Sequence, residues 1–256
     1  MSKFADKLKS LSKSSAAPIG FHPSVSKMRN PAMLLIAGLS ETQIKETKTV
    51  TAVNADAGLI LSEGASDKIV GQMAKTLGDV PLGVFVKDMS EQKIKELASL
   101  GCDFVVFNIK VTAAVLQKEK IGRFLMIEPS LDQGFVRSIN SLEVDGVFIH
   151  YRDGNSFVAI EHLLVYRRFV EILEKPVIMI LPSLVTKAEL ANLWQAGING
   201  VVSPLTQSLE ALIELKKMIG DLPRGTRGRH AKIGVRLPHY GEGMASEEDE
   251  EQGEEI

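Results

Sequence analysis

Four polar residues whose side chains can carry proton chemistry end four successive apolar runs of the chain: Lys87, Asn108, Glu128 and His150. A lysine in a partly dry site can act as a general acid, or as a Schiff-base nucleophile when its pKa is lowered. A glutamate beside it can take or return the proton. The asparagine amide can hold a developing oxyanion, and the histidine titrates near neutral pH. These four residues form the predicted catalytic set, although Lys87 and Glu128 could instead form a structural ion pair.

A second group of polar residues lies at or just beyond the ends of the apolar runs and could hold a ligand. Arg152 and Lys110 suit an anionic substrate, such as a phosphate or a carboxylate. We recognise no metal-ligand set, and the single cysteine, Cys102, is expected to be a buried, inert thiol at the start of a run. The candidate ligand-binding residues are Ser62, Asp88, Lys110, Arg152, Ser183, Ser203 and Thr206.

A repeated pattern of strand-like and helix-like segments must position these residues. The strand-like runs are almost continuously apolar, which is typical of parallel strands covered on both faces. The segments between them show helical periodicity, as at Ile94, Leu97 and Leu100, and a further helix is expected over residues 112–118. Eight such units predict a single (β/α)8 TIM barrel with its site at the strand carboxyl ends, and their unbroken alternation favours it over an open doubly wound sheet. The runs are Met33–Ala37, Leu59–Ser62, Leu82–Lys87, Phe104–Asn108, Phe124–Glu128, Val147–His150, Val177–Leu181 and Val201–Ser203.

The composition divides the chain into a basic N-terminal arm at 1–30, the barrel at 31–223, and a tail at 224–256 that is first basic and then acidic. The acidic end is expected to be disordered. In the arm, Phe4, Leu8 and Leu11 recur at helical spacing among lysines. Such a helix could dock on an anionic membrane or a partner; the alternatives are a frayed arm or a lid under the barrel.

The overall composition limits the classes of partner. Of the 256 residues 45% are hydrophobic and 24% are charged, and the net charge is −2, so the chain has no strong field for nucleic acid or membrane. No apolar stretch approaches the roughly 20 residues of a membrane span, and no signal-peptide core is recognised. We expect a cytoplasmic protein that binds a small anionic metabolite. The sequence leaves a homo-oligomer open, and nucleic acid is not expected as a partner.

Two of the runs resemble a known family. Val80–Asp88 resembles the third strand of indole-3-glycerol-phosphate synthase, and Phe124–Glu128 is similar to its fifth strand. The resemblance covers about residues 80–150 and implies an aldolase-type, phosphate-binding barrel, with Lys87 as general acid and Glu128 assisting ring closure and dehydration. The sixth run ends in His150 where that family has asparagine. The segments Leu181–Leu184 and Ser203–Ser208 lack its phosphate-binding glycines, so the resemblance implies the broad class of barrel and not tryptophan-pathway activity.

A second resemblance lies earlier in the chain. Asn54–Leu61 and Val80–Val84 resemble the early part of flavin-dependent barrels such as nitronate monooxygenases, which would imply FMN. The glycine-rich FMN phosphate loops of that group are missing, so we expect no cofactor. The sequence predicts a metal-independent lyase or isomerase that uses Lys87 and Glu128 as acid and base. The alternatives are a non-catalytic barrel that serves as a binding or assembly module, and an FMN-dependent oxidoreductase.

Overall fold

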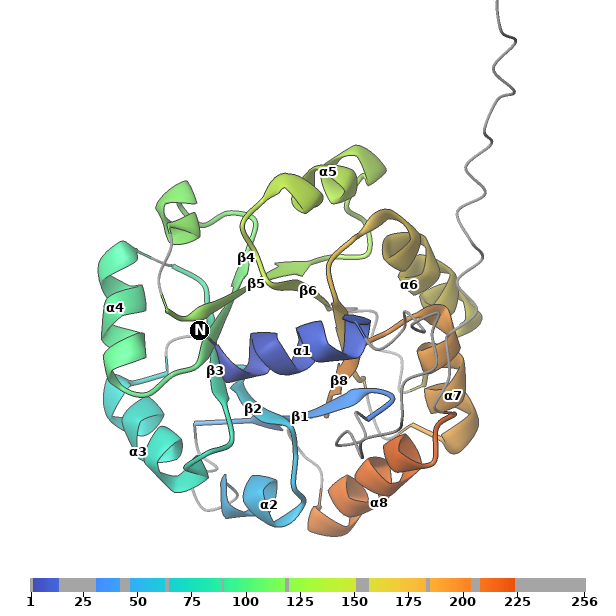
Figure 1. Ribbon diagram of the computed structural model, residues 1–256, viewed down its shortest axis with the longest axis horizontal. Coiled ribbons are helices and arrows are strands. Elements are labelled where there is room, and N and C mark those ends of the chain that lie inside the picture. The colour runs from blue at the N-terminus through green and yellow to red at the C-terminus, as the bar shows by residue number, and fades with distance from the viewer. Residues whose placement is uncertain are drawn as a thin grey trace, which may run out of the picture.

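Eight parallel strands close into a barrel in the order β1 to β8 in the computed structural model, and helices surround it (Figure 1). The prediction of a (β/α)8 TIM barrel is therefore confirmed. The structure describes residues 2–13, 31–41, 47–62, 65–88, 90–117, 120–150, 157–182, 185–203 and 208–223. The strands are β1 (Leu34–Leu39), β2 (Ala57–Ile60), β3 (Leu82–Val86), β4 (Phe104–Asn108), β5 (Gly122–Ile127), β6 (Gly146–Ile149), β7 (Val177–Ile180) and β8 (Gly200–Val202).

The helices follow the strands, as the apolar periodicity predicts, and one further helix precedes them. They are α1 (Lys3–Lys13), α2 (Thr47–Ala52), α3 (Asp67–Leu77), α4 (Glu91–Ser99), α5 (Gln133–Ser138), α6 (Ile160–Ile172), α7 (Lys187–Ala196) and α8 (Leu209–Gly220). Two short 3-10 helices, η2 (Ala113–Leu116) and η3 (Ile139–Ser141), complete the set described. The predicted acidic tail and the rest of the N-terminal arm lie outside the described residues.

Local signals set several helix boundaries. The Ser90 side chain accepts a hydrogen bond from the backbone N–H of Lys93 and caps α4. Thr186 and Glu189 form a reciprocal capping box at the start of α7, and the backbone hydrogen bond from Thr186 holds the pKa of the Glu189 carboxyl below its usual value. Gly197 ends α7 at a φ of 101°, in the left-handed region that favours glycine.

The helix expected over residues 112–118 is reduced to the single 3-10 turn of η2. The guanidinium of Arg123, on the neighbouring β5, donates to the carbonyl oxygens of Val115 and Gln117. A longer α-helix would need those same carbonyls for its own hydrogen bonds. Arg123 therefore replaces helical bonding with a contact to the next strand.

Aromatic side chains and glycines fill the barrel interior in a complementary way. The rings of Phe104, Phe124 and Phe148 pack edge to face, with centroids 5.4 Å and 5.6 Å apart. Gly83 lies beside Phe104 in register, and a Cβ on Gly83 would come within 2.2 Å of that ring. A Cβ on Gly146 would lie 3.0 Å from Phe124. The large rings fit because neighbouring strands contribute no side chain at those points.

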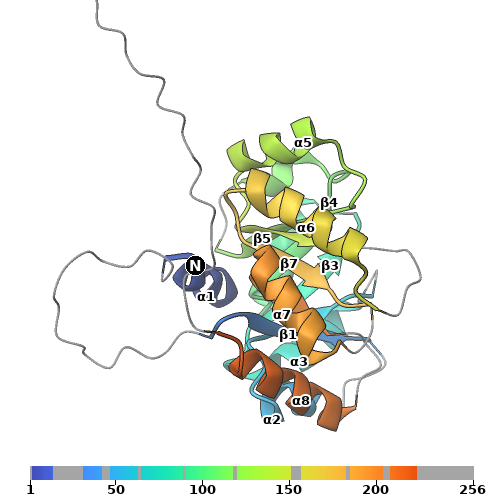
Figure 2. The same cartoon turned by 90° about the vertical axis from the view of Figure 1, so that its right-hand side faces the viewer.

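Helix α1 closes the amino end of the barrel. It crosses the strand ends in the view down the barrel (Figure 1) and lies at one end of it in the side view (Figure 2). Phe4 and Leu8 are fully buried against the interior cluster, and Phe4 stacks on Phe104 at 4.4 Å between ring centroids. Of the alternatives for this segment, the structure thus has the lid under the barrel.

An aspartate or asparagine directly precedes every second strand: Asp56, Asp103, Asp145 and Asn199. In each case its backbone N–H donates to a carbonyl oxygen near the start of the preceding strand, at 2.7 to 2.8 Å. Asp56, Asp145 and Asn199 also accept the N–H of that same residue with their side chains, at 2.9 to 3.0 Å. Asp103 differs, because its carboxylate binds α1 instead.

Candidate functional site

The four residues of the predicted catalytic set lie at the carboxyl ends of β3 to β6: Asn108 is the last residue of β4, and the other three come one residue after their strands. Each follows by two positions a buried residue of the barrel interior, namely Phe85, Val106, Met126 and Phe148. Alternate residues of a strand point to the same side of a sheet. Continued to the strand ends, this alternation assigns Lys87, Asn108, Glu128 and His150 to the inner side of the rim, above an apolar interior.

The strand register places these four residues next to one another around the rim. Val86 pairs with Phe107, so that Lys87 and Asn108 follow side by side. Asn108 pairs with Met126, two residues before Glu128. Ile127 pairs with Ile149, so that Glu128 and His150 follow as neighbours. The four residues, which are far apart in the sequence, therefore lie side by side in the fold and form a continuous polar arc.

The exposure of the arc suits a site that solvent and ligand can reach. Lys87 and Glu128 are exposed, whereas Asn108 and His150 are half-buried. The Asn108 Oδ1 accepts the backbone N–H of Lys110 at 2.8 Å. This bond fixes the orientation of the side-chain amide, so its Nδ2 group is the one that could donate to an oxyanion. Lys110 itself is exposed and lies just beyond the arc.

Two of the other candidate ligand-binding residues, Ser62 and Ser203, lie apart from the arc. Ser62 and Ser203 follow Ile60 and Val201, which face the helix layer, so their positions belong to the outer side of the strands. The Ser203 hydroxyl is buried and accepts the backbone N–H of Gly38 at 3.1 Å. Asp88 is exposed at the end of β3. Three further candidates, Arg152, Ser183 and Thr206, fall outside the described residues.

Sequence reasoning did not single out the apolar part of the rim. On β1 the inner positions Leu34 and Ile36 are followed by Gly38, and on β2 the corresponding residue is Leu61, which packs against the interior cluster. A Cβ on Gly38 would lie 2.4 Å from the Ser203 carbonyl oxygen, so β8 approaches closely there. In the sequence, Gly38 directly after Ala37 is the feature that could have indicated this close approach. The rim is therefore polar over β3 to β6 and apolar over β1 and β2.

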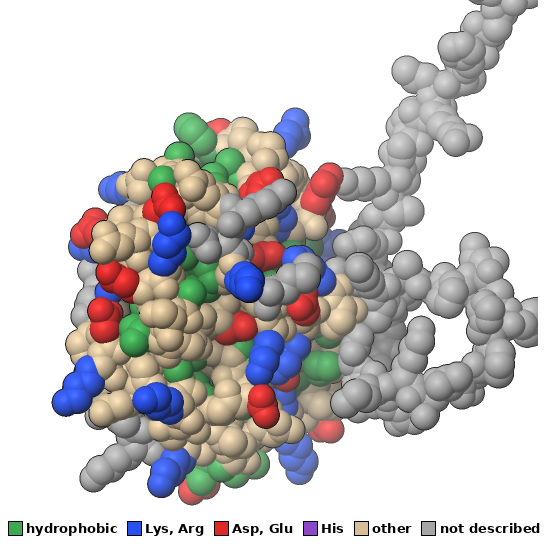
Figure 3. All heavy atoms as spheres, turned by 60° about the vertical axis from the view of Figure 1, so that its left-hand side comes forward, with side chains coloured by type: hydrophobic (Ala, Val, Ile, Leu, Met, Phe, Trp, Pro, Cys, Tyr) green, Lys and Arg blue, Asp and Glu red, His purple; other side chains and the backbone are tan. Residues whose placement is uncertain are grey.

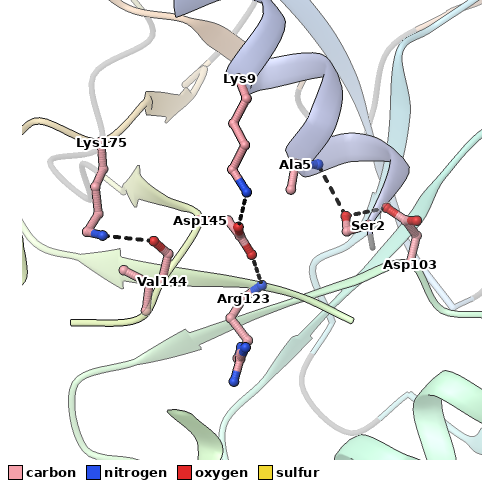
Figure 4. A network of polar contacts seen from close by, with 8 residues as sticks. All are labelled: Ser2, Ala5, Lys9, Asp103, Arg123, Val144, Asp145 and Lys175. Carbon is pink, nitrogen blue, oxygen red and sulfur yellow. Dashed lines mark hydrogen bonds and ion pairs between the residues drawn. The ribbon is translucent and has the colours of Figure 1, made fainter. Parts of the chain in front are cut away.

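The opposite end of the barrel carries a polar network with a different role (Figure 4). Asp145 binds the Lys9 ammonium of α1 at 2.9 Å with one oxygen and the backbone N–H of Arg123 at 3.0 Å with the other. The Lys175 ammonium donates to the Val144 carbonyl, and burial lowers the pKa of Lys175. These contacts hold α1 and the starts of the strands together, so the polar residues at this end have a structural role. The candidate site is therefore at the carboxyl end.

The first motif that suggested a flavin, Asn54–Leu61, begins at the amino end and runs through β2. Asn54, whose φ is 55°, comes just before Asp56 and β2. The Asp56 carboxylate accepts the N–H of Leu35 at 2.9 Å and binds Lys216 at 2.7 Å. Within the motif, this aspartate joins two strands and α8.

The structure also bears on metal binding and membrane insertion, within the part of the chain that it describes. There, no group of three or more histidine, cysteine or acidic side chains is placed to hold a metal ion. None of the helices described has the length and apolar character needed to cross a bilayer. The Cys102 thiol is buried and donates to the Phe104 carbonyl at 3.1 Å, which confirms the prediction of a buried thiol.

Comparison with known proteins identifies the fold. No protein-family model and no curated protein matches the chain. Solved structures do: two mutant forms of the tryptophan synthase alpha-subunit from the hyperthermophile Pyrococcus furiosus superpose with TM-scores of 0.56 and 0.58. In both cases the match is 15% identical and covers 75% of this chain and 98% of the other. At this identity the likeness shows the fold alone, a (β/α)8 TIM barrel.

Proposed function

We propose that the protein is an enzyme of the lyase or isomerase type that acts on a small anionic metabolite at the carboxyl end of its barrel. The observation that carries this proposal is the polar arc: Lys87, Asn108, Glu128 and His150 on the inner face of four successive strands. In barrels of this fold, catalytic residues come from the ends of several different strands.

The roles follow from the side-chain chemistry. Lys87 donates a proton to the substrate, and Glu128 removes one from it, because an ammonium and a carboxylate can serve as acid and base at the same site. Asn108 stabilises negative charge on oxygen through its oriented amide. His150 positions a hydroxyl or relays a proton, and Lys110 attracts the anionic group of the substrate.

The apolar residues below the arc support this chemistry. Phe85 and Met126 are less than a tenth exposed, and Val106 and Phe148 are fully buried. Ion pairs and hydrogen bonds over such a surface are stronger than in water, because the local dielectric constant is lower. A substrate seated there would lose water from one side and meet charged groups on the other.

The experiment is a titration with inorganic phosphate, followed by the backbone amide signals in NMR spectra. We expect the shifts to cluster at Lys87, Asn108, Glu128 and His150, and Lys87→Ala to weaken binding at least about tenfold. The matched control is Lys217→Ala, which removes an exposed lysine from α8. Shifts that lie elsewhere, or that persist unchanged in Lys87→Ala, would contradict the proposed site.

A second measurement separates an enzyme from a binding protein. Small carbonyl compounds with a phosphate or carboxylate group, such as dihydroxyacetone phosphate and oxaloacetate, are incubated with the protein in deuterium oxide. Acid–base chemistry at Glu128 exchanges their acidic C–H hydrogens with solvent, and the rate should fall in Glu128→Gln. Phosphate binding without exchange above the Glu128→Gln background across the panel would favour the non-catalytic alternative.

A further inference from the structure

Helix α6 has two apolar faces, and the barrel covers one of them. Tyr166 and Phe169 are fully buried against the barrel, whereas Ile160 and Leu164 are 77% and 66% exposed. An ordinary surface helix has one apolar stripe and a polar opposite face. Residues that are four positions apart adjoin on a helix surface, so Ile160 and Leu164 form a continuous outward ridge.

Neighbouring residues enlarge this ridge into a patch. Phe157 lies three residues before α6, outside the helix, and is 55% exposed. Helix α5 packs against α6 and carries Phe135, which is 67% exposed. We call Phe135, Phe157, Ile160 and Leu164 the α6 patch. Large apolar side chains that gather in this way mark an interaction surface, whereas single ones need no explanation.

The opposite side of the molecule has a different character. Lys, Arg, Asp and Glu side chains are interspersed over the face where α3 and α4 lie (Figure 3). Several of them pair there, as Lys93 does with Asp67 at 2.6 Å. Helix α6 faces the viewer in Figure 2, on the side of α7 and α8. The exposed apolar side chains near α6 are therefore not typical of the molecular surface as a whole.

We propose that the α6 patch is the interface with a second copy of this chain, with the two α6 helices antiparallel across a two-fold axis near Leu164. In that arrangement each residue faces a residue of the second copy, and the two residue numbers add up to about 328, which is twice the number of Leu164. Leu164 meets its own equivalent, and the stem of Arg167 in the second copy covers Ile160. Such an isologous contact needs a self-complementary surface.

Charge complementarity favours this occupant. Glu161 lies at one end of the ridge and Arg168 lies two turns further along. The Arg168 guanidinium already donates one N–H to the Pro129 carbonyl at 2.9 Å, so a second copy would pair with its remaining N–H groups. Glu161 and Arg168 are seven residues apart, which is two helical turns of about 3.5 residues, so both lie on the same flank of α6. In the antiparallel arrangement Glu161 of each copy therefore lies level with Arg168 of the other, once on each side of Leu164. The intrahelical pair of Arg167 and Glu171, at 3.2 Å, keeps the rest of the ridge neutral. A nucleic acid or an anionic membrane would find no net charge to pair with.

The test is sedimentation of the full chain at protein concentrations from about 1 to about 100 μM. Wild type should dimerise, and Leu164→Glu should raise the dissociation constant at least about tenfold. Helix α8 supplies a control at the same position, because Ile213 is the fifth residue of α8 as Leu164 is of α6, and it is 50% exposed. Ile213→Glu should leave the dissociation constant unchanged.

Charge reversal tests the orientation of the two helices. Glu161→Arg should weaken the dimer by placing two arginines together, and added salt should reduce the effect. The matched control is Glu210→Arg, at the second position of α8 as Glu161 is of α6. The emission of the single tryptophan, Trp194, reports that each variant is folded.

Three outcomes would overturn the proposal. The first is a wild-type chain that stays monomeric at the highest concentration. The second is dissociation by Ile213→Glu as strong as that by Leu164→Glu. The third is a monomer that begins to dimerise when residues 224–256 are removed, because the patch would then be covered by the chain's own tail. None of these results depends on phosphate binding, so the interface and the proposed catalytic site are judged separately.

Discussion

Phe4 stacks on Phe104 with their ring centroids 4.4 Å apart and their planes inclined by 25°. The first ring belongs to the N-terminal helix and the second to the start of β4. Phe4 also lies 5.3 Å from the ring of Phe124. This contact makes the lid a continuation of the barrel interior, and a structural role for the N-terminal arm follows from it.

Removal of the Phe4 ring should therefore destabilise the whole barrel. We expect Phe4→Ala to lower the free energy of unfolding by about 3–5 kcal/mol, because a fully buried ring leaves a cavity in the aromatic cluster. Urea unfolding followed by Trp194 fluorescence measures the change. Ile109→Ala is the control, since Ile109 is 57% exposed and should change stability by less than about 0.5 kcal/mol. Equal effects of the two substitutions would show that the lid is not part of the cooperative unit.

The attachment of the lid should depend on Asp103. Its carboxylate accepts the Ser2 hydroxyl at 2.7 Å and the backbone N–H groups of Lys3 and Phe4 at 2.8 and 3.0 Å. Asp103→Ala should cost about 2 kcal/mol, because it leaves the first turn of α1 without its acceptor.

Amide hydrogen exchange within α1 measures this effect. Protection should fall in α1 before it falls in the strands, because the helix opens locally. Asp79→Ala removes an exposed ion pair with Lys3 and should leave the protection of α1 unchanged. Unaltered protection in Asp103→Ala would refute the capping role.

Gly83 should tolerate no side chain. A Cβ there would lie 2.2 Å from the Phe104 ring, so Gly83→Ala should destabilise by about 1–3 kcal/mol through overpacking. Gly220 is the matched control, because no atom lies within 4 Å of a Cβ at that position in α8. Gly220→Ala should stabilise by about 0.5–1 kcal/mol. Thermal unfolding of the two variants should thus shift in opposite directions, and a shift of both in the same direction would count against the interior packing described.

The Cys102 thiol should make stability depend on alkaline pH. Burial raises the pKa of this thiol from 9.0 to about 12. The native protein therefore holds the proton more tightly than the unfolded chain does, so the contribution is fully present below pH 9.0 and is lost as the pH rises towards about 12.

The measurement compares wild type with Cys102→Ala by urea unfolding at about pH 8 and about pH 10.5. Wild type should lose stability relative to the variant by up to about 1.4 kcal/mol for each pH unit above 9. The native thiol should also resist thiol reagents at the lower pH. A difference between the two proteins that is constant with pH would contradict the burial of the thiol.

The repeated elements of this fold could be predicted from the sequence because their signals are local. The continuous apolar runs predict eight parallel strands, and the structure has them, with ends that differ by a few residues. Ser90 marks a helix start because its side chain accepts a backbone N–H of the first turn, and Gly197 marks a helix end because its backbone adopts the left-handed conformation. The inner positions of Lys87 and Glu128 also follow from the alternation along a strand.

Contacts between distant segments could not be predicted in this way. The pattern of Phe4 and Leu8 requires an apolar partner for α1, but it does not say which surface provides it. The partner depends on Asp103 and Asp145, which come before different strands. The same holds for Arg123, whose guanidinium replaces the end of a predicted helix. Ser203 looks like a ligand-binding residue in the sequence, yet in the fold its hydroxyl holds Gly38.

The order in which the chain is synthesised has a consequence for α1, the lid of the barrel. Helix α1 is made before the strands on which it packs, and Asp145, the partner of its Lys9, lies 136 positions later in the chain. At roughly 5–20 residues per second, that aspartate is added roughly 7 to 27 seconds after Lys9. An isolated helix of 11 residues is marginal in water. Phe4 and Leu8 thus have no completed barrel to pack against until the last strands have been made, and the nascent chain must keep them from other apolar surfaces until then.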